Sequence, residues 1–198
     1  MVEKVFWEDL EFQVPEGVYV PREDSYLSAE ALSEQDLDSA DVLDVGTGCG
    51  FLAIIAASRG VEVEAVDVNP EAVKSAVKNA DRNDLDLKIY RSDLFSEVDS
   101  SFDLITFNAP YIPGEREGRD SEQLAWYGGE GGRAVIDRFI EKVYDFLNGG
   151  GRVLLTQTSL NNPEKTISNL EKRGFRAEVT ATRKISWQEL QVIEAVKV

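Results

Sequence analysis

Short apolar runs alternate along this chain with segments whose apolar residues recur at helical spacing. The apolar runs have the length and composition of buried strands, and the periodic segments are typical of helices that cover a sheet. Strands that alternate with helices predict a parallel sheet with helices on both faces. We expect strands at 41–45, 62–67, 86–90, 102–107 and 152–157, and helices at 22–33, 50–59, 70–80, 134–147 and 163–173.

The two ends of the chain depart from this alternation. Residues 14–20 predict a short extended segment, while 175–182 and 187–196 predict two strands with no helix between them. Two such strands pair as an antiparallel hairpin, so we expect five parallel strands followed by a hairpin. Three glycines at 149–151 are expected to end the helix before them. The glycine-rich stretch 109–133 predicts a long irregular loop, and loops of that length in compact domains are usually functional.

Composition excludes several kinds of chemistry. The chain has 198 residues, one cysteine (Cys49) and no histidine. Without histidine there is no Ser-His-Asp or Cys-His catalysis and no histidine metal ligand, and one cysteine rules out an internal disulfide or a cysteine-cluster zinc site. We therefore expect no metal site. We expect chemistry that uses carboxylates, amides, backbone groups or a bound cofactor.

Acidic residues exceed basic ones by 37 to 21, which gives a net charge of −16. They are scattered rather than gathered in a tail, and this pattern favours a protein of a salt-rich cytoplasm over an ordinary acidic protein. Such a surface opposes phosphate binding, so charge alone disfavours a nucleic-acid partner. No run of about 18 apolar residues and no signal-peptide pattern is present, so we expect a cytoplasmic chain that does not span a membrane.

A glycine-rich loop follows the first predicted strand. Gly46, Gly48 and Gly50 permit a tight turn and let a ligand approach backbone N–H groups, although glycines at this spacing also serve as simple turns. Asp67 ends the next strand, where a carboxylate can bind both ribose hydroxyls of a nucleoside. Its alternative role is a favourable charge at the start of the following helix. The loop favours the nucleoside role.

Two more acidic positions stand near this loop. Asp44 lies inside the first strand, where a carboxylate is costly unless it meets a cation or N–H groups, so either a ligand amine or the loop itself would compensate it. Asp93 and Leu94 follow the third strand, where a side chain can reach the edge of an adenine, or where the chain simply turns.

The fourth strand ends in the tetrad Asn108-Ala109-Pro110-Tyr111. The amide oxygen of Asn108 and the carbonyl of Ala109 are two acceptors that can hold both hydrogens of a planar –NH₂ group, with Tyr111 as a flat wall. Such a grip favours the pyramidal transition state of a delocalised nitrogen over its planar ground state. A turn before Pro110 is the structural alternative. The tetrad's place at the end of a parallel strand favours the functional interpretation.

These residues together resemble a known family. The segments that carry the resemblance are Tyr19-Val20-Pro21-Arg22-Glu23-Asp24-Ser25-Tyr26, the loop 44–50, Asp67-Val68-Asn69-Pro70, Ser92-Asp93-Leu94-Phe95, the tetrad, and Trp126-Tyr127-Gly128-Gly129 leading to Gly132-Arg133. They are similar to class I S-adenosylmethionine-dependent methyltransferases of the HemK-like N5-glutamine type. The resemblance is to the branch that methylates the Gly-Gly-Gln glutamine of eukaryotic and archaeal translation termination factors.

The resemblance implies a Rossmann-like, seven-stranded, mostly parallel sheet in a single domain over 1–198, with 1–33 closing over the cofactor site. It implies S-adenosylmethionine as cofactor and a release factor as protein substrate. The implied contacts are Ser25 to the cofactor, Asp44 and Gly46 to its methionine part, Asp67 to the ribose, Asp93 and Leu94 to the adenine, and Asn108 to the target amide. The family usually has two prolines in the tetrad. Here Ala109 keeps the carbonyl but not the fixed φ of proline.

The family also implies a partner, a small zinc-containing activator protein bound along the edge strand, here Asp86 to Tyr90. Two other interpretations of the residues stay open. The tetrad suits the exocyclic amine of a flipped adenine in DNA or RNA equally well. Ala109 is the one feature that favours a non-catalytic, cofactor-binding scaffold. A nicotinamide oxidoreductase fits neither the glycine spacing nor the terminal hairpin.

Overall fold

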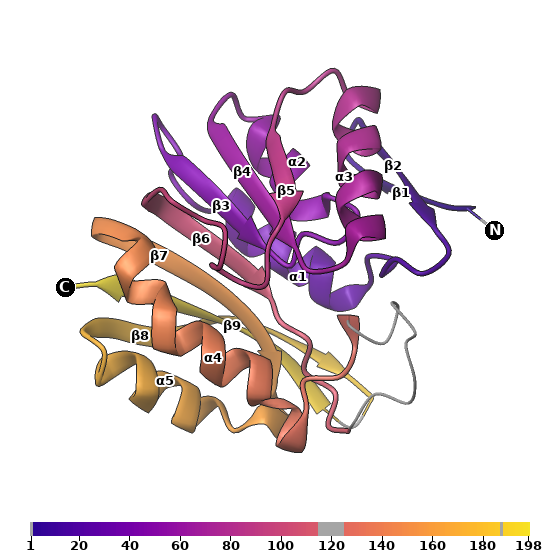
Figure 1. Cartoon of the computed structure of the whole chain (residues 1–198). Coiled ribbons are helices and arrows are strands. Elements are labelled where there is room, and N and C mark those ends of the chain that lie inside the picture. Colours follow the sequence, from indigo (N-terminus) through magenta and orange to yellow (C-terminus); the bar gives the residue numbers. More distant parts are fainter. Residues whose placement is uncertain (1, 115–124, 187) are drawn as a thin grey trace.

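A seven-stranded sheet forms the centre of the molecule, in the strand order β5-β4-β3-β6-β7-β9-β8 (Figure 1). The computed structural model describes residues 2–114, 125–186 and 188–198. The first five strands of that order run parallel, and β9 pairs antiparallel with both β7 and β8. The strands are β3 (Asp41–Val45), β4 (Glu62–Asp67), β5 (Lys88–Arg91), β6 (Phe102–Asn108), β7 (Leu147–Thr158), β8 (Phe175–Ile185) and β9 (Gln188–Lys197).

Helices cover both faces of the sheet, as the alternation of strands and helices predicts. They are α1 (Glu23–Ser33), α2 (Phe51–Ala57), α3 (Pro70–Arg82), α4 (Ala134–Lys142) and α5 (Pro163–Glu171). The expected mostly parallel sheet with a C-terminal antiparallel hairpin is therefore confirmed.

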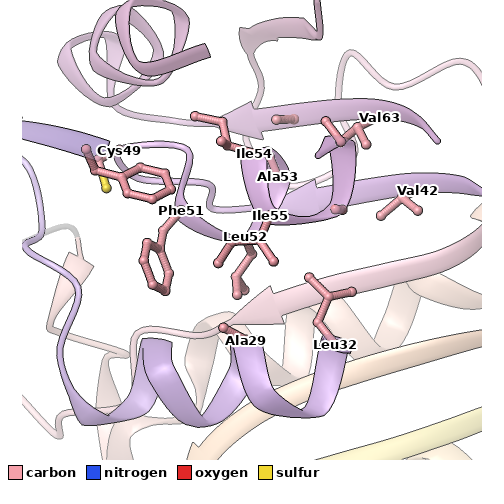
Figure 2. Close-up of a cluster of buried hydrophobic side chains, with 14 of the residues drawn as sticks. Ala29, Leu32, Val42, Cys49, Phe51, Leu52, Ala53, Ile54, Ile55 and Val63 are labelled. Atoms are coloured by element: carbon pink, nitrogen blue, oxygen red, sulfur yellow. The ribbon is translucent and has the colours of Figure 1, made fainter. Parts of the chain in front are cut away.

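Two apolar cores lie on opposite faces of the sheet because neighbouring residues of a strand point to opposite sides. On one face Val42 of β3 packs in the same cluster as Leu32 of α1 and Ile54 of α2 (Figure 2). On the other face Leu43 belongs to the cluster that contains Phe139 of α4. Strands buried on both faces leave their ends as the places where polar side chains can gather.

The N-terminal segment differs from the prediction. Residues 14–20 are not one extended segment, since β2 (Leu10–Pro15) ends at Pro15 and pairs antiparallel with β1 (Val2–Trp7). This separate hairpin lies on α3, where the Gln13 N–H donates to the side-chain oxygen of Asn79 at 2.9 Å. The hairpin thereby holds the N-terminal chain beside the glycine loop.

Three further boundaries were predicted wrongly. The α-helix predicted at 134–147 ends at Lys142, and the short 3-10 helix η3 (Val143–Phe146) follows it. The glycines at 149–151 do not separate helix from strand, because β7 already starts at Leu147 and runs through them. Its pairing with β6 shifts register there, from Phe102 with Leu147 to Leu104 with Arg152, so the glycines form an irregular stretch of strand. The third predicted strand, 86–90, is the shorter and later β5.

Within the described residues, no helix has the length and apolar character required to span a bilayer.

Candidate active site

A cavity of about 280 Å³ opens at the carboxyl ends of β3, β4 and β6, beside the start of α1. This is the position where open parallel sheets bind ligands. The predicted site residues that line it are Ser25, Asp44, Gly46, Gly48, Asp67, Asp93, Leu94, Asn108, Ala109 and Pro110. Gly50 and Tyr111 lie outside this lining. Ten residues that the sequence predicts as site residues therefore lie around one cavity.

The lining is rich in carboxylates. Asp24, Asp44, Asp67 and Asp93 all contribute to it, whereas Arg138 is the one lysine or arginine in the lining that the structure describes. Three of these carboxylates come from separate strands or helices, so the fold has concentrated negative charge that the sequence scatters. A ligand with a positive charge is favoured in such a cavity over one that carries phosphates.

Asp44 lines the cavity and is buried, with 2% of its surface exposed. Its Oδ1 accepts a hydrogen bond from the Thr106 hydroxyl at 2.7 Å, while its Oδ2 is buried without a partner among the residues described. Burial raises the pKa of this carboxyl to about 6. A buried carboxylate oxygen without a donor is costly, so the wall is incomplete without a ligand that donates hydrogen bonds.

Asp67 fixes the glycine loop in place. One of its oxygens accepts the backbone N–H of Gly48 at 2.9 Å, and the other accepts that of Asn69 at 2.8 Å. Burial raises the pKa of Asp67 above its ordinary value. Each carboxylate oxygen has a further lone pair, so Asp67 can hold the loop and still accept hydroxyl groups of a ligand.

Gly50 serves packing rather than the cavity. It precedes α2 with a φ of +88°, and a Cβ at this position would lie 3.1 Å from the Cβ of Ala76 and 3.0 Å from Cδ1 of Ile54. A side chain here would push α2 away from α3. Gly50 therefore permits the close approach of two helices behind the loop.

Asp93 and Leu94 form the far side of the cavity. Asp93 makes an ion pair with Arg138 of α4, with 2.8 Å between Oδ2 and a guanidinium nitrogen. Leu94 adopts a left-handed φ of +52°, and its carbonyl accepts the hydroxyl of Ser92 at 2.8 Å. This ion pair joins the loop after β5 to α4 beside the cavity.

Asn108 meets a carboxylate that the sequence left without a role. The Nδ2 group of Asn108 donates to Oδ2 of Asp24 at 3.2 Å and lies 3.4 Å from the Ser25 hydroxyl. The Oδ1 of Asn108 is buried and has no partner in the described part of the chain. The amide therefore has its donor end occupied and its acceptor end available.

Tyr111 stands behind this pair rather than on the cavity wall. Its hydroxyl donates to Oδ2 of Asp24 at 3.3 Å, and the Tyr19 hydroxyl donates to Oδ1 at 2.7 Å. Burial, together with the charge of Asp24, raises the pKa of both phenols, so both remain protonated donors. Tyr19, which lines the cavity, and Tyr111, which lies behind its wall, thus hold Asp24 from two sides.

The comparisons with known proteins agree with this geometry. The methyltransferase small domain family matches residues 16–184. A protein of Methanocaldococcus jannaschii, provisionally named as a protein N5-glutamine methyltransferase, is 38% identical over 95% of this chain and 96% of its own. This chain belongs to the methyltransferase small domain family. Its similarity to the N5-glutamine methyltransferases confirms the resemblance that the motifs indicated.

Two further relatives of this methyltransferase define its place in the family. Human methyltransferase HEMK2 is 31% identical over 91% of this chain and 90% of its own. A chain of the E. cuniculi Mtq2–Trm112 complex superposes with a TM-score of 0.75 at 29% identity, covering 92% of this chain and 99% of that one. The Mtq2–Trm112 complex is responsible for methylation of the eRF1 translation termination factor. These full-length matches identify the chain as an enzyme of the methyltransferase class.

The methyltransferase holds its tetrad partly with residues that no sequence pattern singled out. Asn161 donates through Nδ2 to the Tyr111 carbonyl at 2.8 Å, and the buried Arg133 donates to the carbonyl of Asn161 and to Thr166. Gly132 packs directly against the same Tyr111 carbonyl. Asn161 and Thr166 sit in segments that read as ordinary polar surface, so only their burial shows their role. The sequence did single out Gly132-Arg133, but without a contact to assign.

Asn79 is a second residue of the methyltransferase that the sequence did not reveal. It lies fully buried in α3, donates to the Cys49 carbonyl of the glycine loop at 2.9 Å, and also donates to the Gln13 carbonyl at 3.2 Å. On a helix with many polar residues, the sequence alone indicates that such an asparagine faces solvent. Its burial makes it a connection between the N-terminal hairpin and the loop.

The raised pKa of Asp44 predicts how the stability of the ligand-free methyltransferase depends on pH. A folded-state pKa of about 6 against an ordinary 3.8 means that the fold favours the protonated carboxyl. As the pH rises from about 4 to above 6, ionisation of Asp44 therefore lowers the free energy of unfolding by up to about 3 kcal/mol. We expect Asp44→Asn to raise the unfolding free energy relative to wild type at pH 8.

Urea denaturation of both proteins at pH 4 and pH 8 measures this difference. The gain should be present at pH 8 and should shrink toward pH 4, where Asp44 is protonated in the folded wild type and about half protonated in the unfolded chain. Equal differences at both pH values would show that the Asp44 charge does not carry the effect.

Proposed function

We propose that this methyltransferase transfers a methyl group from S-adenosylmethionine to the side-chain nitrogen of the glutamine in the Gly-Gly-Gln motif of a translation termination factor. The observation that carries the proposal is the amide of Asn108. Its oxygen is buried, lacks a partner among the described residues and belongs to a residue of the cavity wall. A planar –NH₂ group is the ligand chemistry that such an acceptor needs.

The donor set of the cavity fits S-adenosylmethionine. Asp44, with its unpartnered Oδ2, would receive the ammonium of the methionine part together with the backbone at Gly46. Asp67 would accept the ribose hydroxyls, and Asp93 and Leu94 would face the adenine. The carboxylates favour a ligand with a sulfonium charge and no phosphate, which disfavours a nicotinamide dinucleotide. When bound, this cofactor would supply an electrophilic methyl group to the glutamine nitrogen, with S-adenosylhomocysteine as the leaving group.

The chain itself contributes alignment. Oδ1 of Asn108 and the carbonyl of Ala109 would accept one hydrogen each from the substrate amide and leave the nitrogen lone pair directed away from both. Fixing the reactants in this way replaces a collision between two free molecules, and alignment alone is worth effective molarities of roughly 10⁵ M or more. The departing proton passes to water, because the amide nitrogen becomes acidic only as the methyl bond forms.

Transfer to alternative substrates tests the proposal. The purified protein, supplied with S-adenosylmethionine in concentrated salt, is offered a Gly-Gly-Gln peptide, its Gly-Gly-Asn counterpart and adenine-containing oligonucleotides, and mass spectrometry counts the methyl groups. We expect a single methyl on the glutamine peptide alone. Methylation of the oligonucleotides instead would assign the tetrad to adenine, and cofactor binding without transfer to any of them would identify a scaffold.

We propose further that a small activator protein binds along β5, as the Mtq2–Trm112 relative suggests. Strand β5 occupies one end of the sheet order and pairs only with β4 among the described strands. The Ser92 N–H donates to the Asp67 carbonyl at 3.0 Å, so the alternation of a parallel ladder directs the backbone of Ile89 outward. An added strand would pair there, close to Asp67 and the cofactor cavity. Residues 1–33 would complete the enclosure, with Tyr19 to Ser25 beside the cavity.

The pairing at β5 predicts the effect of removing one N–H group. Ile89→Pro abolishes the outward donor, whereas Ile89→Ala loses the same side-chain packing but keeps that donor. We expect the proline variant to lose co-purification with the activator from the native host while the alanine variant retains it. Equal loss in both variants would indicate that side-chain packing, and not strand pairing, holds the partner.

A further inference from the structure

Asp24 is a buried carboxylate at the start of α1 whose two oxygens face different groups. It is 4% exposed. Oδ1 accepts the Tyr19 hydroxyl at 2.7 Å and the backbone N–H of Ser25 at 2.8 Å, while Oδ2 accepts Nδ2 of Asn108 and the Tyr111 hydroxyl. The Ser25 hydroxyl also donates to Oδ1 at 3.3 Å, so five donors converge on one side chain. The neighbouring Glu23 is exposed and pairs instead with Arg183 on β8.

The two ends of the Asn108 amide are almost identical in shape, so contacts alone decide which end points where. A carboxylate only accepts hydrogen bonds, and Asp24 therefore attracts the Nδ2 end of the amide and repels its oxygen. The Oδ1 end is consequently turned away from Asp24 and remains without a partner among the residues that the structure describes.

We propose that Asp24 is a positioning residue that selects the orientation of the Asn108 amide and so presents its oxygen to the substrate nitrogen. The inference rests on the proposed function, because it assumes that the group to be bound is an –NH₂ donor. With the opposite orientation, the –NH₂ of Asn108 would face the –NH₂ of the substrate, and two donors without an acceptor repel each other. The protonated phenols of Tyr19 and Tyr111 keep Asp24 itself in place from both sides.

Asp24→Asn tests this selection without changing the size of the side chain. The Ser25 backbone N–H cannot turn away, so the new asparagine keeps its oxygen at the Oδ1 position and places its –NH₂ where Oδ2 was. That –NH₂ now faces Asn108, which rotates to offer its oxygen. We expect kcat for the Gly-Gly-Gln peptide to fall by about 10²-fold, with the affinity for S-adenosylmethionine changed by no more than about threefold.

The reciprocal swap gives a sharper test. Asn108→Asp alone sets two carboxylates against each other and should also lose activity. In the double variant D24N/N108D, the –NH₂ of residue 24 donates to one oxygen of residue 108, and the second oxygen again faces the substrate as an acceptor. We expect the double variant to exceed each single variant by at least about tenfold in kcat, a coupling that unrelated structural damage would not produce.

Glu23→Gln is the matched control, because it removes a carboxylate from the same helical turn without touching the cavity. It should retain the wild-type kcat. The inference is overturned if Asp24→Asn keeps a kcat within about threefold of wild type, or if the double variant is no better than the more active single variant.

A spectroscopic measurement keeps this inference separate from the proposed function. The side-chain –NH₂ protons of Asn108, assigned by their loss in Asn108→Ala, should show nuclear Overhauser contacts to the β protons of Ser25 in wild type and lose them in Asp24→Asn. Unchanged contacts in Asp24→Asn would refute the selection of orientation whatever the substrate is. A wild-type protein that shows the contacts but does not methylate the peptide would instead refute the proposed function alone.

Discussion

Asn108→Ala should reduce methyl transfer to the Gly-Gly-Gln peptide by about 10³-fold and leave cofactor binding largely intact. The substitution removes the buried oxygen that we propose as the main acceptor for the substrate amide. The cofactor contacts proposed for Asp44 and Asp67 come from β3 and β4, and they do not depend on this side chain. Single-turnover kinetics gives the transfer rate, and calorimetry gives the affinity for S-adenosylmethionine.

Asn148→Ala is the appropriate control for this experiment. Asn148 is partly buried, as Asn108 is, and also donates its –NH₂ to an aspartate, Asp103, at 2.8 Å. It belongs to the irregular stretch of β7 and takes no part in the cavity. We expect its loss to leave the transfer rate unchanged. Wild-type turnover in Asn108→Ala would mean that the amide oxygen has no part in the reaction.

Gly132→Ala should both unfold the loop around the tetrad and abolish activity. A Cβ at this position would lie 2.1 Å from the Tyr111 carbonyl oxygen and 2.5 Å from Nδ2 of Asn161. Both are atoms of the network that holds the tetrad, so neither is free to move aside. We expect the free energy of unfolding to fall by about 3 kcal/mol or more, with transfer lost in the protein that remains folded.

Gly131→Ala is the control that separates the effect of steric overlap from the effect of backbone strain. Gly131 has a φ of +59°, close to the +68° of Gly132, but a Cβ there would meet nothing within 4 Å. The left-handed conformation costs an alanine about 1–2 kcal/mol at either position. Urea denaturation should therefore show a clearly larger loss for Gly132→Ala than for Gly131→Ala. If the two losses were alike, conformational strain alone would account for both.

The strands and helices of the sheet were largely predictable because burial on both faces leaves a plain pattern. The strands 41–45 and 62–67 appear with the expected bounds, since every buried position in them is apolar or carries a cavity residue. The N-terminal hairpin was not predicted because its turn lacks the usual signal. Glu8 adopts a left-handed φ of +49° where glycine or asparagine would mark the turn.

The glycines at 149–151 misled for the opposite reason. Consecutive glycines usually end a helix, yet here the helix had already ended and β7 continues through them. Glycine is common both at helix ends and in irregular strands. Only the pairing with β6 distinguishes the two cases here, and β6 lies more than forty residues earlier in the chain. Local sequence does not contain that information.

For the site, the sequence predicted which residues take part, whereas their contacts with one another became visible only in the fold. The positions of Asp44, Asp67 and Asn108 followed from their places at strand ends, because such ends meet at one edge of a parallel sheet. The role of Asp24 did not follow, since neither composition nor spacing distinguishes it from Glu23 beside it. Only the packing of α1 against β6 shows that one carboxylate is enclosed and the other exposed.

The long span of chain between contacting groups has a consequence for how the protein folds. Asp24 and Asn108 are 84 positions apart, and the buried hydroxyls of Ser28 and Thr156, which lie 2.7 Å from each other, are 128 apart. Contacts over such distances form slowly, because a large loop must close before any energy is gained. During refolding, β3 and β4 should therefore be paired well before the amide of Asn108 acquires its orientation. A partly folded chain would not yet bind the substrate amide.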